Sequence, residues 1–175
     1  MARITATITA VTELGAEIKS FRFQAPAGQP LAGMAPGCHV DLFLPNGLNR
    51  QYSLWDWDPA GAWISVGVKR ETSGRGGSAW LHDNLSEGGT IELGDIRNNF
   101  PLDEAAEASV LIAGGIGVTP MIAMARQLLE KGRRFRFYYL ARNAGAAGFT
   151  EVLAGLGLGD ALTRHLDDRD GLFDI

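Results

Sequence analysis

The first half of the chain alternates short hydrophobic runs with turn residues, which is the pattern of antiparallel β-structure. From about residue 3 to 92, Pro, Gly and Asn separate the runs at short intervals. The runs lie at residues 6–11, 18–23, 39–44 and 63–68. Several short strands so spaced predict an antiparallel barrel. One helix is predicted to interrupt it, from about residue 78 to 85.

The pattern changes after residue 102. Continuous apolar strands are predicted at 109–113 and 135–140, helices at 118–131 and 150–156, and a third strand that begins at Thr163. Strands and helices that alternate in this way indicate a doubly wound parallel sheet, whose buried strands need not alternate apolar and polar residues. We therefore expect a β-barrel over residues 1–102 followed by an α/β domain over residues 103–175.

The second unit is short for a sheet of this type. It holds roughly 70 residues, whereas domains commonly have about 100–150. We expect it to be incomplete, either because the sequence is truncated or because it is a natural fragment. In both cases something else must cover the unfinished sheet edge.

Composition narrows the function classes. Hydrophobic residues make up 46% of the chain and charged residues 21%, which is ordinary for a soluble globular protein. The formal charge of -4 gives no general attraction to nucleic acid or anionic lipid. Four basic residues between Lys131 and Arg136 lie at a predicted helix end, where cations favour the helix dipole. Because neither a long apolar segment nor a signal peptide occurs, we expect a cytoplasmic protein without nucleic-acid or membrane partners.

Cysteine and histidine usage argues against a metal centre. Cys38 is the single cysteine, so the chain has no intrachain disulfide and no iron–sulfur cluster of its own, which normally needs four thiolates. Cys38 is expected to be a small core residue. The three histidines, His39, His82 and His165, lack the spacing of paired metal ligands. We expect no metal site.

Two motifs suggest phosphate and ring recognition. The segment from Arg50 to Leu54 reads Arg-Gln-Tyr-Ser-Leu, so on a strand Arg50, Tyr52 and Leu54 share one face and Ser53 faces oppositely. The segment from Gly114 to Pro120 joins an apolar strand to a helix. Such a glycine-rich turn lets backbone N–H groups approach a phosphate and directs a positive helix end at it. Together the two motifs predict a flavin site that faces a dinucleotide site.

A third glycine-rich segment, residues 74–78, precedes the predicted helix of the barrel half. Its glycines and Ser78 can form a helix N-terminus that holds a phosphate. Structural alternatives stay open for each motif. In these alternatives, the barrel strand simply exposes an arginine and buries a tyrosine, and the turn after residue 113 only connects a strand to a helix. Ser78 then only caps its helix.

Taken together and in this order, the segments resemble the ferredoxin reductase superfamily, specifically its FMN-dependent reductases of the phthalate dioxygenase reductase and vanillate demethylase reductase type. The resemblance covers nearly the whole chain and includes Val68-Lys69-Arg70. It implies a flavin-binding barrel followed by an NAD(P)-binding α/β domain. The implied enzyme is an NAD(P)H-dependent flavoprotein reductase that transfers hydride to FMN and passes electrons to an iron–sulfur centre of an aromatic-ring oxygenase or demethylase.

The resemblance assigns roles residue by residue. Arg50 reaches the flavin phosphate, Tyr52 packs against the isoalloxazine, and Ser53 lies near its N5 atom. Thr119 faces both the flavin and the nicotinamide, so Ser53 and Thr119 are the expected catalytic residues. Arg142 follows the second parallel strand, where it contacts the adenosine ribose or its phosphate, or else is a solvated loop residue. The other implied cofactor-binding residues are Gln51, Leu54, Val68, Lys69, Gly76, Gly77, Ser78, Gly114, Gly115, Gly117 and Val118.

The resemblance leaves several questions open. A phosphate at residues 74–78 favours FMN over FAD, but NADH and NADPH are not distinguished. Reductases of this type usually continue through a Cys-Gly-Pro segment into a domain with a 2Fe-2S cluster, and neither occurs in these residues. Two other functions remain: a flavin-binding fragment that pairs with a partner chain without turnover, and a stand-alone flavin or ferric reductase. The terminal acceptor and the oligomeric state are likewise undetermined.

Overall fold

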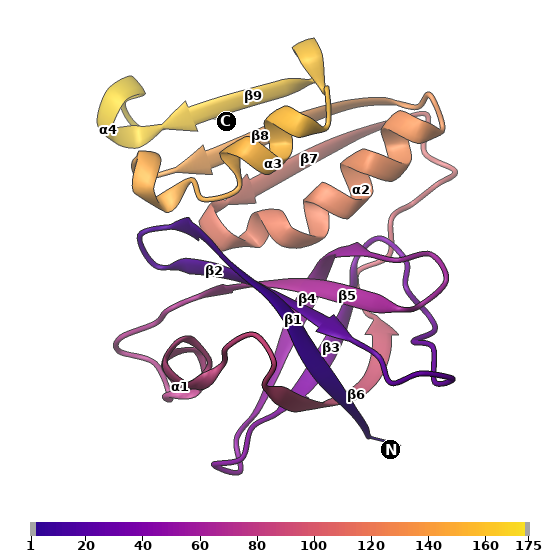
Figure 1. The fold of residues 1–175 in the computed structure, drawn as a ribbon. Helices are drawn as coiled ribbons and strands as arrows, with labels where there is room; N and C mark the ends of the chain where they lie inside the picture. The colour runs from indigo at the N-terminus through magenta and orange to yellow at the C-terminus, as the bar shows by residue number, and fades with distance from the viewer. Residues whose placement is uncertain (1–2, 174–175) are drawn as a thin grey trace.

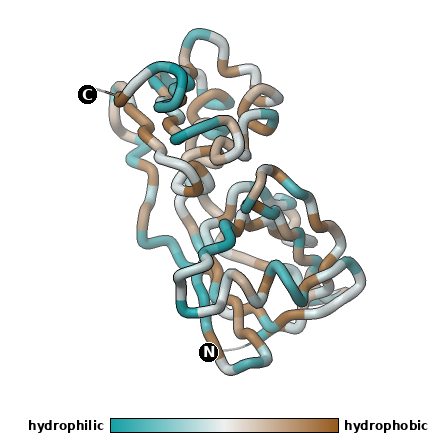
Figure 2. Tube along the Cα trace, turned by 90° about the vertical axis from the view of Figure 1, so that its left-hand side faces the viewer, coloured by the Kyte–Doolittle hydropathy of each residue, from teal (hydrophilic) through white to brown (hydrophobic). Residues whose placement is uncertain are grey.

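The computed structural model describes residues 3–173 and has two parts. A barrel forms the lower part of Figure 1, and a small parallel sheet with its helices lies above it. Figure 2 shows the same two parts from the side as separate lobes. The predicted combination of an antiparallel barrel with an incomplete parallel-sheet domain is confirmed.

The barrel is closed by six antiparallel strands in the order β1-β2-β5-β4-β3-β6. The strands are β1 (Ile4–Gly15), β2 (Ile18–Gln24), β3 (Cys38–Phe43), β4 (Asn49–Trp57), β5 (Trp63–Lys69) and β6 (Thr90–Asn98). The helix α1 (Gly77–Asn84) lies between β5 and β6 in the chain, close to the predicted position. The β-structure was expected to end at about residue 92, but β6 continues to Asn98 because it pairs with both β1 and β3.

Alternating side chains fill the barrel, as the pleat of a strand requires. On β2 the inward residues Phe21 and Phe23 are fully buried, as are Val40 and Leu42 on β3. Cys38 belongs to the same core and is a free thiol, which confirms its prediction as a core residue.

The second part is a three-stranded parallel sheet in the order β7-β8-β9. Its strands are β7 (Ala108–Gly114), β8 (Arg134–Ala141) and β9 (Leu162–Leu166), and its helices are α2 (Val118–Glu130), α3 (Thr150–Gly155) and the short α4 (Asp167–Asp170). Single 3-10 turns occupy Gly115–Gly117, Ala144–Ala146 and Gly159–Ala161. The predicted order of strand, helix, strand, helix and strand is therefore confirmed.

One expectation about this sheet is wrong. The strand β7 was expected to be buried throughout, but Val110 is 64% exposed and Ile112 is 42% exposed, whereas Leu111 and Ala113 are buried. The reason is that α2 and α3 pack on one face of the sheet only (Figure 1). Among the described residues, no helix covers the other face.

The two parts pack closely where β5 meets the second domain. A Cβ atom built on Gly67 would lie 2.6 Å from Cζ of Phe149 and 2.8 Å from Cγ2 of Thr119. Beside this contact, the rings of Trp55 and Phe149 form an edge-to-face pair with centroids 5.6 Å apart. Gly67 therefore lets the barrel approach the second domain more closely than any other residue would.

The basic residues near the end of α2 are engaged within the chain. Lys131 pairs with the Glu104 carboxylate, and Arg133 donates to the Glu104 carbonyl at 2.7 Å. Arg136 donates to the Asp160 carbonyl at 2.6 Å. These contacts support a structural role for the cluster. Within residues 3–173, no helix is long and apolar enough to cross a bilayer.

Candidate functional site

The strand β4 presents the residues of the first motif on two faces, as predicted. Leu54 is fully buried in the barrel core, and Tyr52 packs against the same core while half-buried. Burial raises the pKa of the Tyr52 phenol to about 12, and the nearby charge of Arg50 opposes this shift. Ser53 faces the other way and is half-buried, and Gln51 is exposed.

Arg50 reaches across to the start of α1. Its guanidinium donates to the Asn49 carbonyl at 2.7 Å and to the Arg75 carbonyl at 3.1 Å. A Cβ atom on Gly77 would lie only 2.4 Å from Arg50 Nε, so the arginine lies directly against the glycine backbone. Gly76, just before, has a φ of 78°, a conformation that favours glycine. The predicted residues of the first and third motifs are thus brought together.

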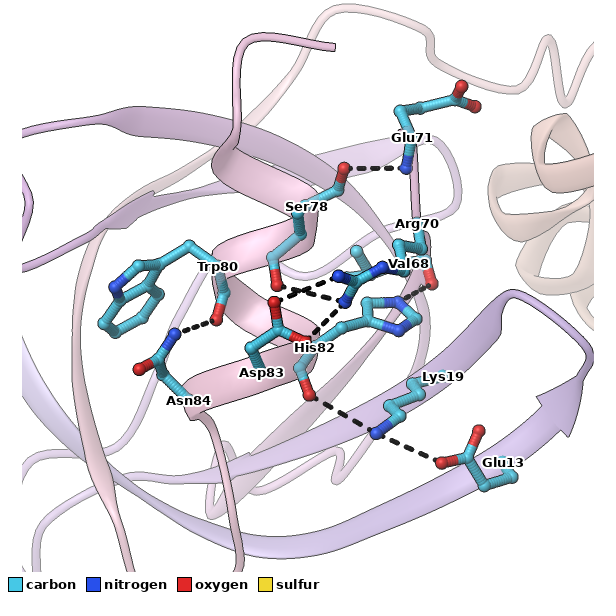
Figure 3. A network of polar contacts seen from close by, with 11 residues as sticks. Glu13, Lys19, Val68, Arg70, Glu71, Ser78, Trp80, His82, Asp83 and Asn84 are labelled. Carbon is cyan, nitrogen blue, oxygen red and sulfur yellow. Dashed lines mark hydrogen bonds and ion pairs between the residues drawn. The ribbon is translucent and has the colours of Figure 1, made fainter. Parts of the chain in front are cut away.

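Polar contacts fasten α1 to the barrel (Figure 3). The Arg70 guanidinium binds both carboxylate oxygens of Asp83, at 2.6 and 3.0 Å. This pairing holds the pKa of the Asp83 carboxyl below its usual value. His82 Nε2 lies 2.9 Å from the Val68 carbonyl. These contacts connect the last turn of α1 to the end of β5.

Ser78 does not cap α1. Its hydroxyl accepts a hydrogen bond from the backbone N–H of Glu71 at 3.0 Å, outside the helix (Figure 3). The N-cap position is Gly76, and the helix has no side-chain cap. The interpretation of Ser78 as a simple helix cap is therefore wrong, and the first N–H groups of α1 are not satisfied by its side chain.

A cavity of about 590 Å³ lies where the barrel meets the sheet. On the barrel side it is lined by the β1–β2 turn at residues 16–18, by Lys69 and by Glu71. On the other side it is lined by residues 114–116 and 140–143, at the carboxyl ends of β7 and β8, and by neighbouring residues. This edge of a parallel sheet is where α/β proteins commonly bind nucleotides.

The glycine-rich turn after β7 leaves open space in front of its backbone. A Cβ atom on Gly114, Gly115 or Gly117 would meet no other atom within 4 Å. Gly115 has a φ of 57° and starts the 3-10 turn that leads into α2. The turn therefore offers bare backbone to the cavity, as close approach to a phosphate requires.

Val118 and Thr119 lie behind this turn. Val118 is fully buried and Thr119 is 5% exposed, so neither lines the cavity. The Thr119 hydroxyl donates to the Ile116 carbonyl at 3.2 Å, and its methyl group faces Gly67. In this arrangement Thr119 supports the turn and the domain contact.

Some lining residues were missed by the sequence analysis. Glu71 forms an ion pair with Lys69 at 3.0 Å and puts a carboxylate at the cavity. Asn143 lines it next to Arg142, and its side chain accepts the Ala146 N–H at 2.9 Å. The position of Asn143 directly after β8 was the available signal. Within the described part of the chain, no group of three His, Cys, Asp or Glu residues is arranged to hold a metal ion.

Comparison with known proteins adds to this geometry. The chain is 38% identical over 161 residues to a vanillate O-demethylase oxidoreductase of Pseudomonas sp. This alignment covers 92% of this chain and 51% of that protein. It is 40% identical over 160 residues to the phthalate dioxygenase reductase of Burkholderia cepacia, and the alignment covers 90% of this chain and 50% of that protein. A solved structure of phthalate dioxygenase reductase superposes with a TM-score of 0.91 and 37% identity, over 99% of this chain and 55% of that one.

Over nine tenths of its length, the chain is similar to reductases of the phthalate dioxygenase reductase and vanillate demethylase reductase type, in sequence and in fold. A comparison with models of protein families gave no match. The chain spans about half the length of the relatives that it matches. This similarity confirms the resemblance found in the sequence.

Proposed function

We propose that this chain is the flavin- and nucleotide-binding part of an NAD(P)H-dependent reductase. It takes hydride from NAD(P)H to FMN and passes electrons to an iron–sulfur centre of an aromatic-ring oxygenase or demethylase. The observation that carries the proposal is the presence of two candidate cofactor sites, one in each part of the chain. The contact of Arg50 with Gly77 forms one, and the cavity between Lys69 and Gly115 forms the other.

The residues around α1 fit a flavin phosphate. Arg50 supplies a planar fork of donors, and the uncapped start of α1 at Gly76 and Gly77 adds backbone N–H groups. Tyr52 offers a ring for stacking. Lys69 lines the cavity, whereas Val68 beside it is fully buried in the barrel core. When bound, FMN supplies the hydride-accepting ring, while this chain positions it and excludes water.

FMN is proposed over FAD because Arg50 and the uncapped start of α1 offer donors for a phosphate. Arg50 lies against Gly77 there, and the Ser78 hydroxyl accepts a hydrogen bond from the Glu71 N–H just after β5. Gln51 and Leu54 flank Tyr52 and Ser53 on β4. Gln51 is exposed, and Leu54 lies in the barrel core.

The cavity is proposed to hold the nicotinamide nucleotide. Gly114, Gly115 and Gly117 give its phosphates access to backbone N–H groups, and Arg142 contacts the ribose or its phosphate. Ser53 is proposed to hydrogen-bond the flavin N5 atom. Thr119 and Val118 are proposed to support the glycine-rich turn, which brings the nicotinamide to the flavin N5 atom. Hydride transfer needs this stacking geometry and no general acid or base.

The acceptor is proposed from the relatives. The names of several refer to oxygenase systems, among them a phenoxybenzoate dioxygenase subunit of Ectopseudomonas oleovorans that is 42% identical over 158 residues, 90% of this chain and 49% of that protein. The solved phthalate dioxygenase reductase is described as a modular structure for electron transfer from pyridine nucleotides to a 2Fe-2S cluster. A partner or domain with such a cluster is therefore the proposed electron acceptor.

A second candidate is a flavin-binding unit that does not turn over by itself. It is favoured by the outer face of the sheet, where Val110 and Ile112 are exposed. Such a unit pairs with a partner chain that covers this face. It binds FMN but does not oxidise NADH when alone.

Equilibrium titration with three flavins tests the proposal. FMN is expected to bind at least about tenfold more tightly than riboflavin, a difference of about 1.4 kcal/mol, because only FMN carries the phosphate for Arg50. FAD is expected to bind more weakly than FMN. Equal affinities for FMN and riboflavin would contradict a phosphate site at Arg50 and Gly77.

A further inference from the structure

More acidic than basic side chains line the cavity between the two parts of the chain. Among the described residues, its charged lining consists of the cations Lys69 and Arg142 and the anions Glu17, Glu71 and Asp167. Lys69 is the last residue of β5, and this strand lies beside the 3-10 turn of residues 115–117. Lys69 is therefore the cation that the barrel contributes close to the glycine-rich turn.

The Lys69 ammonium is already bound by a carboxylate. Its Nζ atom lies 3.0 Å from Oε1 of Glu71, two residues further along the chain. Both side chains are partly open to solvent, since Lys69 is 37% exposed and Glu71 is 54% exposed. Exposed ion pairs of this kind contribute little to stability, so Lys69 can exchange one anion for another at little cost.

The backbone of Glu71 is held in place independently of its side chain. Its N–H donates to the Ser78 hydroxyl at 3.0 Å, and its carbonyl accepts from the Gly74 N–H at 3.4 Å. Figure 3 shows the Glu71 side chain extending away from α1. A glutamine at this position keeps nearly the same size and both backbone contacts, and it removes only the negative charge at the cavity.

We propose that Glu71 competes with the phosphates of the nicotinamide nucleotide for Lys69 and so lowers the affinity of the cavity for the nucleotide. The inference rests on the proposed function, in which the nucleotide occupies this cavity. Carboxylates and phosphates both accept charge-assisted hydrogen bonds from an ammonium. The nucleotide therefore has to displace the Glu71 carboxylate before Lys69 can donate to a phosphate. Because Glu71 acts on the reduced and the oxidised nucleotide alike, it also favours release of the oxidised product.

Isothermal titration calorimetry with ADP-ribose measures this competition directly. ADP-ribose carries the pyrophosphate of the nucleotide but no nicotinamide, so its binding needs neither flavin nor turnover. The titration is made at low ionic strength, where exposed charges are least screened. Glu71→Gln is expected to tighten the binding of ADP-ribose by about two- to fivefold, the range that an exposed ion pair gives. Lys69→Gln is expected to weaken it.

The matched control is Glu92→Gln. Glu92 pairs with Arg3 at 2.8 Å and is 48% exposed, so this substitution removes the same charge from a similar ion pair. Glu92 lies on β6 and is not among the described residues that line the cavity. Glu92→Gln is therefore expected to leave the affinity for ADP-ribose unchanged.

A double variant separates competition for Lys69 from simple repulsion of the ligand. In the Lys69→Gln background Glu71 has no ammonium to occupy at this position, so the addition of Glu71→Gln is expected to give no further tightening. Tightening of the same size with and without Lys69 would mean that the Glu71 charge only repels ADP-ribose, and the proposal would be overturned.

The outcomes separate this inference from the proposed function. If ADP-ribose binds but Glu71→Gln leaves its affinity unchanged, or alters it no more than Glu92→Gln does, only the role of Glu71 is overturned. If ADP-ribose binds neither to the unsubstituted chain nor to Glu71→Gln, the nucleotide site of the proposed function fails and this inference fails with it.

Discussion

Arg50 lies against the backbone of Gly77, so closely that a Cβ atom on the glycine would be 2.4 Å from Arg50 Nε. The two residues are far apart in the sequence, on β4 and at the start of α1. The barrel brings the guanidinium to a helix N-terminus, and both groups attract a phosphate. This pair is the centre of the proposed flavin site.

Gly77→Ala is therefore expected to displace Arg50 and to weaken FMN binding at least about tenfold, or about 1.4 kcal/mol. The measurement is a fluorescence titration with FMN. Gly155→Ala is the matched control, because a Cβ atom there meets no atom within 4 Å and the residue lies in α3, away from the site. Equal weakening by both substitutions would contradict the contact.

Arg50→Ala is expected to weaken FMN binding by about 1.5–3 kcal/mol, the scale of a lost hydrogen bond to a charged group. The same titration with riboflavin should show almost no change, because riboflavin lacks the phosphate. A similar loss for both flavins would show that Arg50 supports the fold and not the phosphate.

Gly67→Ala is expected to lower the free energy of unfolding by about 1–3 kcal/mol, the usual cost of overpacking. The new methyl group would press on Phe149 Cζ and Thr119 Cγ2, at 2.6 and 2.8 Å. Urea unfolding monitored by tryptophan fluorescence, to which Trp55 beside Phe149 contributes, measures the effect. A variant as stable as the unsubstituted chain would contradict the close domain contact.

The Tyr52 phenol gives a pH prediction. Its pKa is raised to about 12 in the folded chain by burial, against 10.0 for a free side chain. The pKa of Tyr52 is higher in the folded chain than in the unfolded chain. The stability that the protonated phenol contributes is therefore fully present below pH 10 and is lost as the pH rises from 10 to about 12. Absorbance titration of the phenols should show a late component that is smaller in Tyr52→Phe, because burial raises the pKa of the Tyr139 phenol as well. No difference between the two titrations would contradict the burial.

Much of the fold was predictable because the local patterns agree with the tertiary contacts. Strands such as β2 alternate with Phe21 and Phe23 inside, and α2 follows its glycine turn as expected. The end of β6 was missed because its pairing with β3 is a long-range contact. The exposed face of β7 was missed because Val110 and Ile112 read as core residues in the sequence alone.

The candidate site was predictable in its residues but not in its arrangement. The motifs indicated Arg50 and Gly77 separately, and only the closed barrel shows that they touch. The role of Gly67 in the domain contact carries no sequence signal, since it reads as an ordinary strand glycine. The hydrogen bond from the Glu71 N–H to the Ser78 hydroxyl was not predictable either, because it joins two residues across the loop that precedes α1.

The central claim is that this chain brings FMN and a nicotinamide nucleotide together for hydride transfer. An absorbance spectrum from about 300 to 600 nm, recorded on the FMN-loaded chain before and after anaerobic addition of NADH or NADPH, tests it most directly. The account predicts flavin bands that bleach when one of the nucleotides is added. Flavin bands that persist with both nucleotides would contradict hydride transfer by this chain, and the absence of bound flavin would contradict the flavin site itself.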